Sequence, residues 1–246
     1  MKYDIQRAGM GKRFGAWFLD AFLFISLAVL IISLLSEMVH LGDHTVKLDN
    51  IYAEYEEKYG ISFYMTQEDW DKMSEEEKLI MNHAATMLAQ DMEAKQTYEM
   101  VLNLILLTLS LGLLIPYLIL EIAVPLLFKN GQTLGKKALG LAVMRTDSVK
   151  ISPFLLFVRT VLGKYTVETM IPVAFLVMSV FGLVNINGLL FLTLFLTLQL
   201  GIMGFTRNRS TIHDLMSHTV VVEYSSQMIF DCPEARDAYE ARINEN

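Results

Sequence analysis

The sequence predicts an all-α integral membrane protein with four transmembrane helices. Of its 246 residues, 53% are hydrophobic and 19% are charged, whereas soluble domains carry about 25% charged residues. The apolar residues form blocks, each close to the roughly 20 residues that cross a bilayer as a helix. Blocks of this length favour a membrane protein over the alternative, a soluble all-α core. They are residues 14–35, 101–128, 165–184 and 188–205.

The first block has features of both a signal peptide and a retained span. Four basic residues precede it, namely Lys2, Arg7, Lys12 and Arg13. A signal peptide, however, has a core of only about 7–15 apolar residues and ends in a small-residue cleavage site. This block is longer and no such site follows it, so we expect an uncleaved transmembrane helix.

The distribution of Lys and Arg predicts the orientation, because cytoplasmic loops of membrane proteins are enriched in both. Basic residues precede the first block, lie between the second and third, and follow the fourth, whereas the connection "NING" has none. Segment 37–99 carries five Lys and fifteen Asp or Glu. We therefore expect a multi-pass protein of the cell (inner or plasma) membrane, with both termini in the cytoplasm and 37–99 outside.

The chain accordingly divides into six segments. They are an N-terminal tail with the first span (1–36), an acidic extracytoplasmic helical insertion (37–100), the second span (101–128), a cytoplasmic loop (129–164), the third and fourth spans (165–206) and a cytoplasmic C-terminal tail (207–246). Within the loop and tail, stretches 139–146 and 217–224 have strand-like, β-branched patterns. We expect them to pair as a small cytoplasmic sheet, in the manner of a β-hairpin.

The acidic outer segment contains helix-start signals. Ser74 and Glu77 have capping-box spacing, and Thr66 with Asp69 marks a shorter helix before them. No Pro or Gly follows Ser74 until Gly112. These features predict one long helix from about residue 75 through the second span, a long extracytoplasmic extension of that span. Its surface is either a solvated acidic face, a docking platform for another protein or an entrance that attracts cations.

Several charged residues fall within or beside the apolar blocks. Arg13 and Asp20 are seven residues apart, which places them on one helix face about 10 Å apart along the axis. Glu121, Glu168 and Asp214 also lie near predicted cytoplasmic ends. All four carboxylates are therefore expected in the cytoplasmic half of the membrane or at its inner edge.

Two interpretations of these charges remain open. In the structural one, Arg13 pairs with Asp214 or Asp20 and pins the first span to the region after the fourth. In the functional one, Asp20 and Glu121 form a cation or proton site, because two close carboxylates do not both stay ionised easily. His213 either titrates near neutral pH or only forms hydrogen bonds. Glu168 either contributes or reaches towards the interface.

The sequence contains no enzyme motif. It lacks G-x-S-x-G, H-E-x-x-H and a Walker loop, since "GQTLGKKALG" differs from G-x-x-x-x-G-K-[ST]. We expect Lys136 and Lys137 of that stretch to meet anionic lipid head groups. Cys232 is the single cysteine, which excludes a disulfide within the chain, and the pI of about 5.3 does not suggest a nucleic-acid partner. We expect no enzymatic activity, no cofactor and no metal centre.

Three stretches together resemble the signature blocks of the RDD family of membrane proteins. They are "RFGAWFLD", "GQTLGKKALGLAVMRTD" and "TIHDLMSHTVVV", and the resemblance covers residues 10–35 and 115–222. By matching position, the Arg and two Asp that name the family are Arg13, Asp20 and Asp214. The chain departs from the family at "HDLMSH", where "HDRLAG" is more usual. The resemblance implies sodium/proton antiport as one activity, since some members look like such antiporters.

The leading hypothesis is a membrane protein that moves or binds monovalent cations, coupled to protons. The expected partners are the lipid bilayer, these cations and protons, and a second copy of the chain. The alternative is a non-transporting assembly or docking subunit that uses its acidic outer helix to bind a membrane partner. The candidate site residues are Arg13, Asp20, Glu121 and Asp214, with Glu168 and His213 as contributors.

Overall fold

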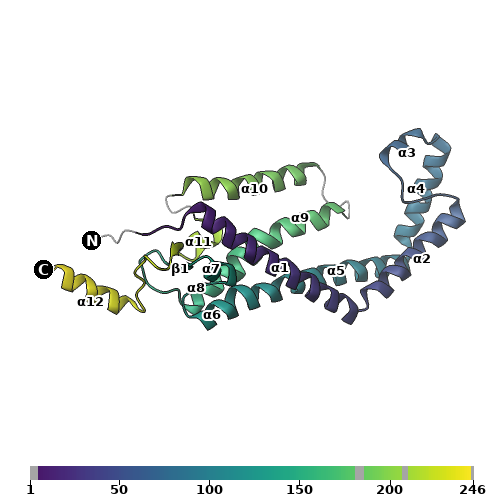
Figure 1. Ribbon diagram of the computed structural model, residues 1–246. Helices are drawn as coiled ribbons and strands as arrows, with labels where there is room; N and C mark the ends of the chain where they lie inside the picture. Colours follow the sequence, from purple (N-terminus) through teal and green to yellow (C-terminus); the bar gives the residue numbers. More distant parts are fainter. Residues whose placement is uncertain (1–4, 181–185, 207–209, 245–246) are drawn as a thin grey trace. The chain divides into compact units, whose positions relative to one another are not determined.

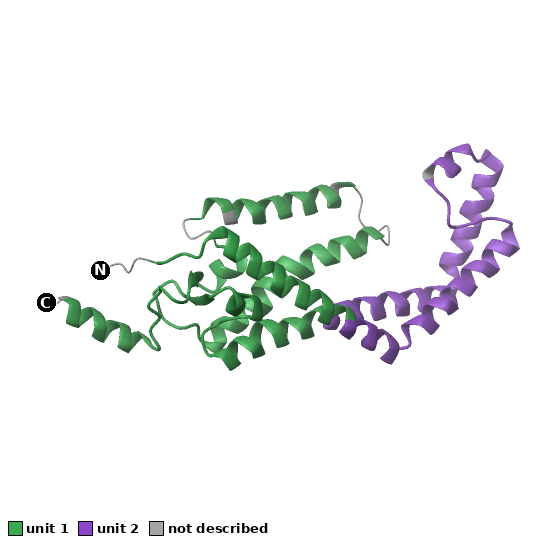
Figure 2. Cartoon of the chain, viewed as in Figure 1, with its two compact units in different colours: residues 1–29, 113–246 green, residues 30–112 purple. Residues whose placement is uncertain are grey.

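The computed structural model describes residues 5–180, 186–206 and 210–244. Residues 181–184, the predicted end of the third span, lie outside these ranges, as do Arg207 and Arg209, which were counted for the orientation. The chain forms two compact units, shown in Figure 2: unit 1 comprises residues 1–29 and 113–246, and unit 2 residues 30–112.

The described residues include three helices long and apolar enough to cross a membrane. The first is α1 (Met10–Met38). The second joins α5 (Met92–Leu118), η1 (Ile119–Ala123) and α6 (Val124–Phe128), and the third joins α8 (Pro153–Phe157), η2 (Val158–Met170) and α9 (Ile171–Val180). The predicted membrane character and the mostly helical fold are thereby confirmed, whereas a count of four spans is not.

The fourth predicted block forms helix α10 (Ile186–Phe205). Its strongly apolar part, Gly188–Ile202, is shorter than the three candidate spans. Helix α10 lies beside α9 in unit 1 (Figure 1), and the rings of Phe175 and Phe191 are 4.9 Å apart between the two helices.

Two segments within the spans are π-helical. Segment η1 contains Glu121, and the 13-residue η2 contains Arg159, Lys164 and Glu168. Pro125 gives a local reason for η1, because proline has no N–H to donate to the carbonyl four residues earlier, which is that of Glu121. The hydroxyl of Thr160 donates to this carbonyl instead, at 3.2 Å. Two buried charged residues, Glu121 and Arg159, lie in these segments, and π-helical turns are frequent at functional sites.

Unit 2 contains α2 (Leu41–Tyr59), α3 (Gln67–Lys72) and α4 (Glu75–Gln90). Both predicted capping boxes are present, at Thr66 before α3 and at Ser74 before α4. Within the unit, α2 buries Leu48 and α4 buries Met81 and Ala84.

The prediction of one long helix from residue 75 through the second span was wrong. Helix α4 ends at Gln90, and Asp91 has an extended backbone with φ −69° and ψ 118°. The Asp91 carboxylate accepts the N–H groups of Glu93 and Ala94 at 2.8 and 3.2 Å, so it caps the start of α5. The Tyr55 hydroxyl donates to its other oxygen at 2.9 Å and fixes the break against α2. A Pro-free and Gly-free stretch did not prevent an Asp from starting a new helix.

The small sheet was predicted correctly. Strand β1 (Leu141–Arg145) pairs antiparallel with β2 (Thr219–Glu223), with Val143 opposite Val221. Two short helices adjoin the strands, α7 (Leu134–Ala138) before β1 and α11 (Ile212–Met216) before β2. Figure 1 shows β1, α7, α8 and α11 gathered at one end of unit 1. The chain continues past the sheet to α12 (Pro233–Asn244).

We predict that Asp91→Ala increases amide hydrogen exchange at Glu93 and Ala94 by roughly three- to tenfold, the usual effect of losing an N-cap. The Ala94 amide and the Tyr55 hydroxyl lower the pKa of Asp91 from its usual 3.8. A depressed carboxyl pKa stabilises the fold above the unfolded value, so this protection also fades as the pH falls below about 4. Asp91→Asn retains a capping oxygen and is the control. Equal exchange in the Ala variant contradicts the assignment of Asp91 as the cap.

Candidate functional site

Asp20 is held by the turn that begins helix α7. Its carboxylate accepts hydrogen bonds from the Thr133 hydroxyl at 2.5 Å and the Gly135 amide at 2.7 Å, and the Lys136 ammonium lies 3.3 Å away. Thr133 is the N-cap of α7, so the start of this helix is folded around the carboxylate. A Cβ on Gly135 would lie 2.8 Å from Asp20 Oδ1. Glycine is thus required for the close approach of α7 to α1.

Glu121 lies on η1 and is buried. Its Oε1 pairs with the ammonium of Lys164 on η2. Its Oε2 lies 3.8 Å from Arg159 Nη1, but within the described residues this buried oxygen receives no hydrogen bond. Glu121 is therefore the carboxylate of the network with unused hydrogen-bonding capacity.

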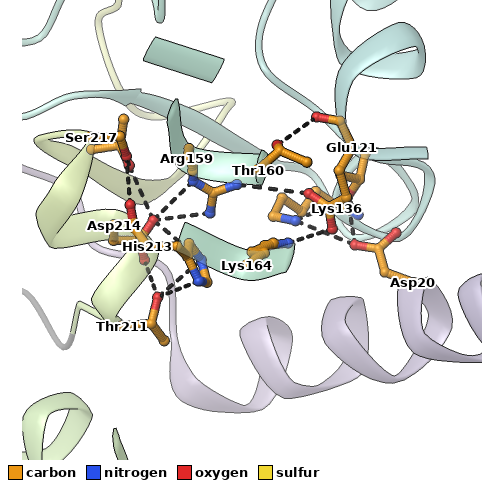
Figure 3. A network of polar contacts seen from close by, with 12 residues as sticks. Asp20, Glu121, Lys136, Arg159, Thr160, Lys164, Thr211, His213, Asp214 and Ser217 are labelled. Atoms are coloured by element: carbon orange, nitrogen blue, oxygen red, sulfur yellow. Dashed lines mark hydrogen bonds and ion pairs between the residues drawn. The ribbon is translucent and has the colours of Figure 1, made fainter. Parts of the chain in front are cut away.

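Arg159 stands between two groups of charged residues, as Figure 3 shows. Its side chain is only 2% exposed. Its Nε and Nη2 donate to Asp214 Oδ1 at 3.1 and 2.9 Å, while Nη1 faces Glu121. One guanidinium thus connects α11 with η1 through η2.

Asp214 is the most completely satisfied acid of the network. Besides Arg159, the hydroxyls of Thr211 and Thr219 donate to it, each at 3.1 Å, and Arg13 Nη2 lies 3.8 Å away. Burial alone would raise the pKa of Asp214, but the neighbouring Arg159 and His213 outweigh this effect and hold its pKa well below the usual 3.8. The carboxyl group is therefore ionised at neutral pH.

Glu168 and His213 form a further contact of the network. The His213 backbone N–H donates to Glu168 Oε1 at 3.1 Å, and its Nδ1 lies 2.7 Å from Oε2. A Cβ on Gly163 would lie 2.5 Å from His213 Cβ, so α11 packs directly on η2. Burial lowers the pKa of His213 below its usual 6.5 despite the two acids beside it.

Five of the six predicted site residues are connected through contacts with Arg159 and Asp214, namely Arg13, Glu121, Glu168, His213 and Asp214, whereas Asp20 has a separate set of partners. Arg13 forms an ion pair with Asp214, as the structural interpretation of the sequence suggested, while Asp20 takes its partners from the α7 turn. Lys136 was expected at lipid head groups but is buried against Asp20. Lys137, its neighbour, lies over the ring of Phe128 with its Nζ 3.6 Å from the centroid.

Sequence reasoning missed Arg159 and Lys164 as site residues because it began the third span at residue 165. The helix begins at Pro153, with Ser152 as its N-cap, and the two cations therefore lie inside the third candidate span. The signal that would have found this start is the Ser-Pro pair, since Pro is favoured in the first turn and Ser at the N-cap.

The chain was compared with models of known protein families. The family model described as "RDD family" matches residues 7–218, which is most of the chain. This chain belongs to the RDD family. The three residues that the resemblance assigned to the family signature all form ion pairs in this RDD protein, Arg13 with Asp214 and Asp20 with Lys136. No curated protein and no solved structure matches the chain.

We predict that Gly135→Ala destabilises this RDD protein by about 1–3 kcal/mol, the usual cost of overpacking. The added methyl group pushes on the Asp20 carboxylate and the α1 backbone at Ala16. Gly11→Ala is the matched control, because nothing lies within 4 Å of a Cβ at that position. Thermal unfolding in detergent compares the two variants. A Gly135→Ala protein as stable as the Gly11→Ala protein contradicts the close fit of α7 around Asp20.

Proposed function

We propose that this RDD protein exchanges a monovalent cation for a proton across the cell membrane, and that the Glu121–Lys164 pair is the exchange site. The observation that carries the proposal is the buried Oε2 of Glu121, which receives no hydrogen bond from the described residues. Asp20 and Asp214, by contrast, each accept several hydrogen bonds. They act as structural clamps, and Glu121 is the acid with room for a ligand.

The charges of the network support a neutral exchange. The network contains four carboxylates, Asp20, Glu121, Glu168 and Asp214, and four cations, Arg13, Lys136, Arg159 and Lys164. The two sets carry equal and opposite charge when His213 is neutral. When Lys164 releases a proton, the Glu121 carboxylate loses the closer of its two counter-charges and accepts one monovalent cation. One positive charge leaves and one enters, so the site keeps its charge in a low-dielectric surrounding.

The free-energy cost of placing charged groups inside a membrane also favours a functional network over a purely structural one. Ionisable groups inside a membrane are expensive and mark functional sites by default. A buried ion pair that only holds helices together can often be replaced by apolar side chains without loss of stability. Several such pairs on two π-helical segments are better explained by ion exchange than by helix packing alone.

The proposed topology follows from the charge distribution. Helix α10 is the fourth span, both termini and the network lie on the cytoplasmic side, and the acidic segment 37–99 lies outside. We also propose that the protein has no enzymatic activity and requires no cofactor, because the sequence carries no catalytic motif.

A docking subunit is the second candidate function. Leu79, Ile80 and Met87 are exposed on α4, a helix whose first turn is acidic. Met87 follows Ile80 by seven positions, which places them on one helix face. In a docking subunit, removing residues 50–95 abolishes function and Glu121→Gln is tolerated, whereas an exchanger shows the reverse.

The test of exchange uses purified protein in vesicles that contain a pH-sensitive dye. Adding sodium, lithium or potassium outside should change the internal pH in wild-type vesicles. Glu121→Gln keeps the size of the side chain but removes its charge, and it should reduce this response to that of protein-free vesicles.

Lys12→Gln is the matched control, because it breaks an ion pair with Glu223 in which the Lys12 side chain is 53% exposed. It should leave the response unchanged. Wild-type protein without a response to any of the three cations, or a Glu121→Gln protein with the wild-type rate, rules out the exchange site.

A further inference from the structure

A layer of aromatic side chains adjoins the charged network in unit 1. Phe24 follows Asp20 by four residues on α1, and Tyr117 precedes Glu121 by four residues on the second span. Each ring therefore lies one helical turn from a network acid. The Phe24 and Tyr117 rings meet, with their centroids 4.4 Å apart.

The same layer includes the third candidate span. The Tyr117 ring lies 6.2 Å from that of Tyr165, the residue after Lys164, in an edge-to-face arrangement. The Tyr117 hydroxyl is hydrogen-bonded to that of Thr169 at 2.8 Å. We name Phe24, Tyr117, Tyr165 and Thr169 the aromatic layer. Within this layer, Tyr117 on α5 contacts both α1, at Phe24, and η2, at Tyr165 and Thr169.

We infer that the aromatic layer seals the charged network from the extracytoplasmic half of the membrane, and that Tyr117 is the gating residue of this seal. The inference rests on the proposed exchange function and adds the gate that such a site needs. Without a barrier on one side, a buried site open to both solutions conducts ions passively instead of exchanging them.

The composition of the layer suits a gate. Aromatic rings form a constriction that repels water and ions. The Tyr117 and Thr169 hydroxyls satisfy each other in the closed state, so neither polar group is left unpaired. On opening, water replaces this one hydrogen bond. Rotation of the Tyr117 side chain therefore separates η2 from α5 at a low cost and gives a path to Glu121.

The network on the other side of the layer is partly open. The side chains of Glu168, Asp20 and Arg13 are 21%, 15% and 14% exposed. In this proposal, ions reach Glu121, whose side chain is only 9% exposed, past these partly exposed groups, and the aromatic layer controls access from the other side.

The test measures passive proton leak in vesicles under an imposed pH gradient, with no cation gradient present. Tyr117→Ala removes the ring that meets both neighbours, and Phe24→Ala is a second variant that removes the contact from α1. Both should leak faster than wild type. Tyr117→Phe keeps the ring without the hydroxyl and should remain tight. Phe175→Ala, which disrupts the ring pair between α9 and α10, is the control for general loosening.

Tight vesicles with both Tyr117→Ala and Phe24→Ala overturn the seal, and so does an equal leak with Phe175→Ala. The readout does not depend on exchange by the wild-type protein. Leak in the two layer variants with no wild-type exchange supports the seal and rejects the proposed function. Wild-type exchange with no leak in the variants does the opposite.

Discussion

Arg159 pairs with carboxylates from two distant parts of the chain, Asp214 on α11 and Glu121 on η1. The arrangement of unit 1 depends on this shared cation, because neither acid could remain ionised in an apolar surrounding without a counter-charge. Lys164 and Lys136 extend the same compensation to Glu121 and Asp20. These contacts join the second candidate span and α11 to the third candidate span, and they join α7 to α1.

The local backbone accommodates these charged contacts at a few positions. Pro125 cannot donate to the Glu121 carbonyl, and Thr160 on the neighbouring span donates to it instead. Gly135 and Gly163 bring α7 and α11 within contact of Asp20 and η2, where any side chain would collide. The backbone geometry and the charge network therefore depend on each other.

Much of this was predictable from sequence. Apolar block length gave the membrane helices, β-branched runs gave the β1–β2 pairing, and capping spacing gave the starts of α3 and α4. Asp20 was recognisable as an acid within an apolar span, but its partners were not, since the contacts of Thr133 and Lys136 with Asp20 span more than 110 residues. The break at Asp91 was missed because a capping Asp is visible only when its side chain is seen to accept the amides of the next turn.

The central claim is that the buried charges stabilise one another rather than acting independently. A double-mutant cycle on Arg159→Leu and Asp214→Leu, followed by unfolding in detergent, tests it most directly. Arg159→Leu alone should cost about 3–5 kcal/mol, because it leaves two buried acids under-compensated. The double variant should be more stable than Arg159→Leu alone, since removing Asp214 removes one of those acids. A double variant whose loss equals the sum of the two single losses contradicts the account.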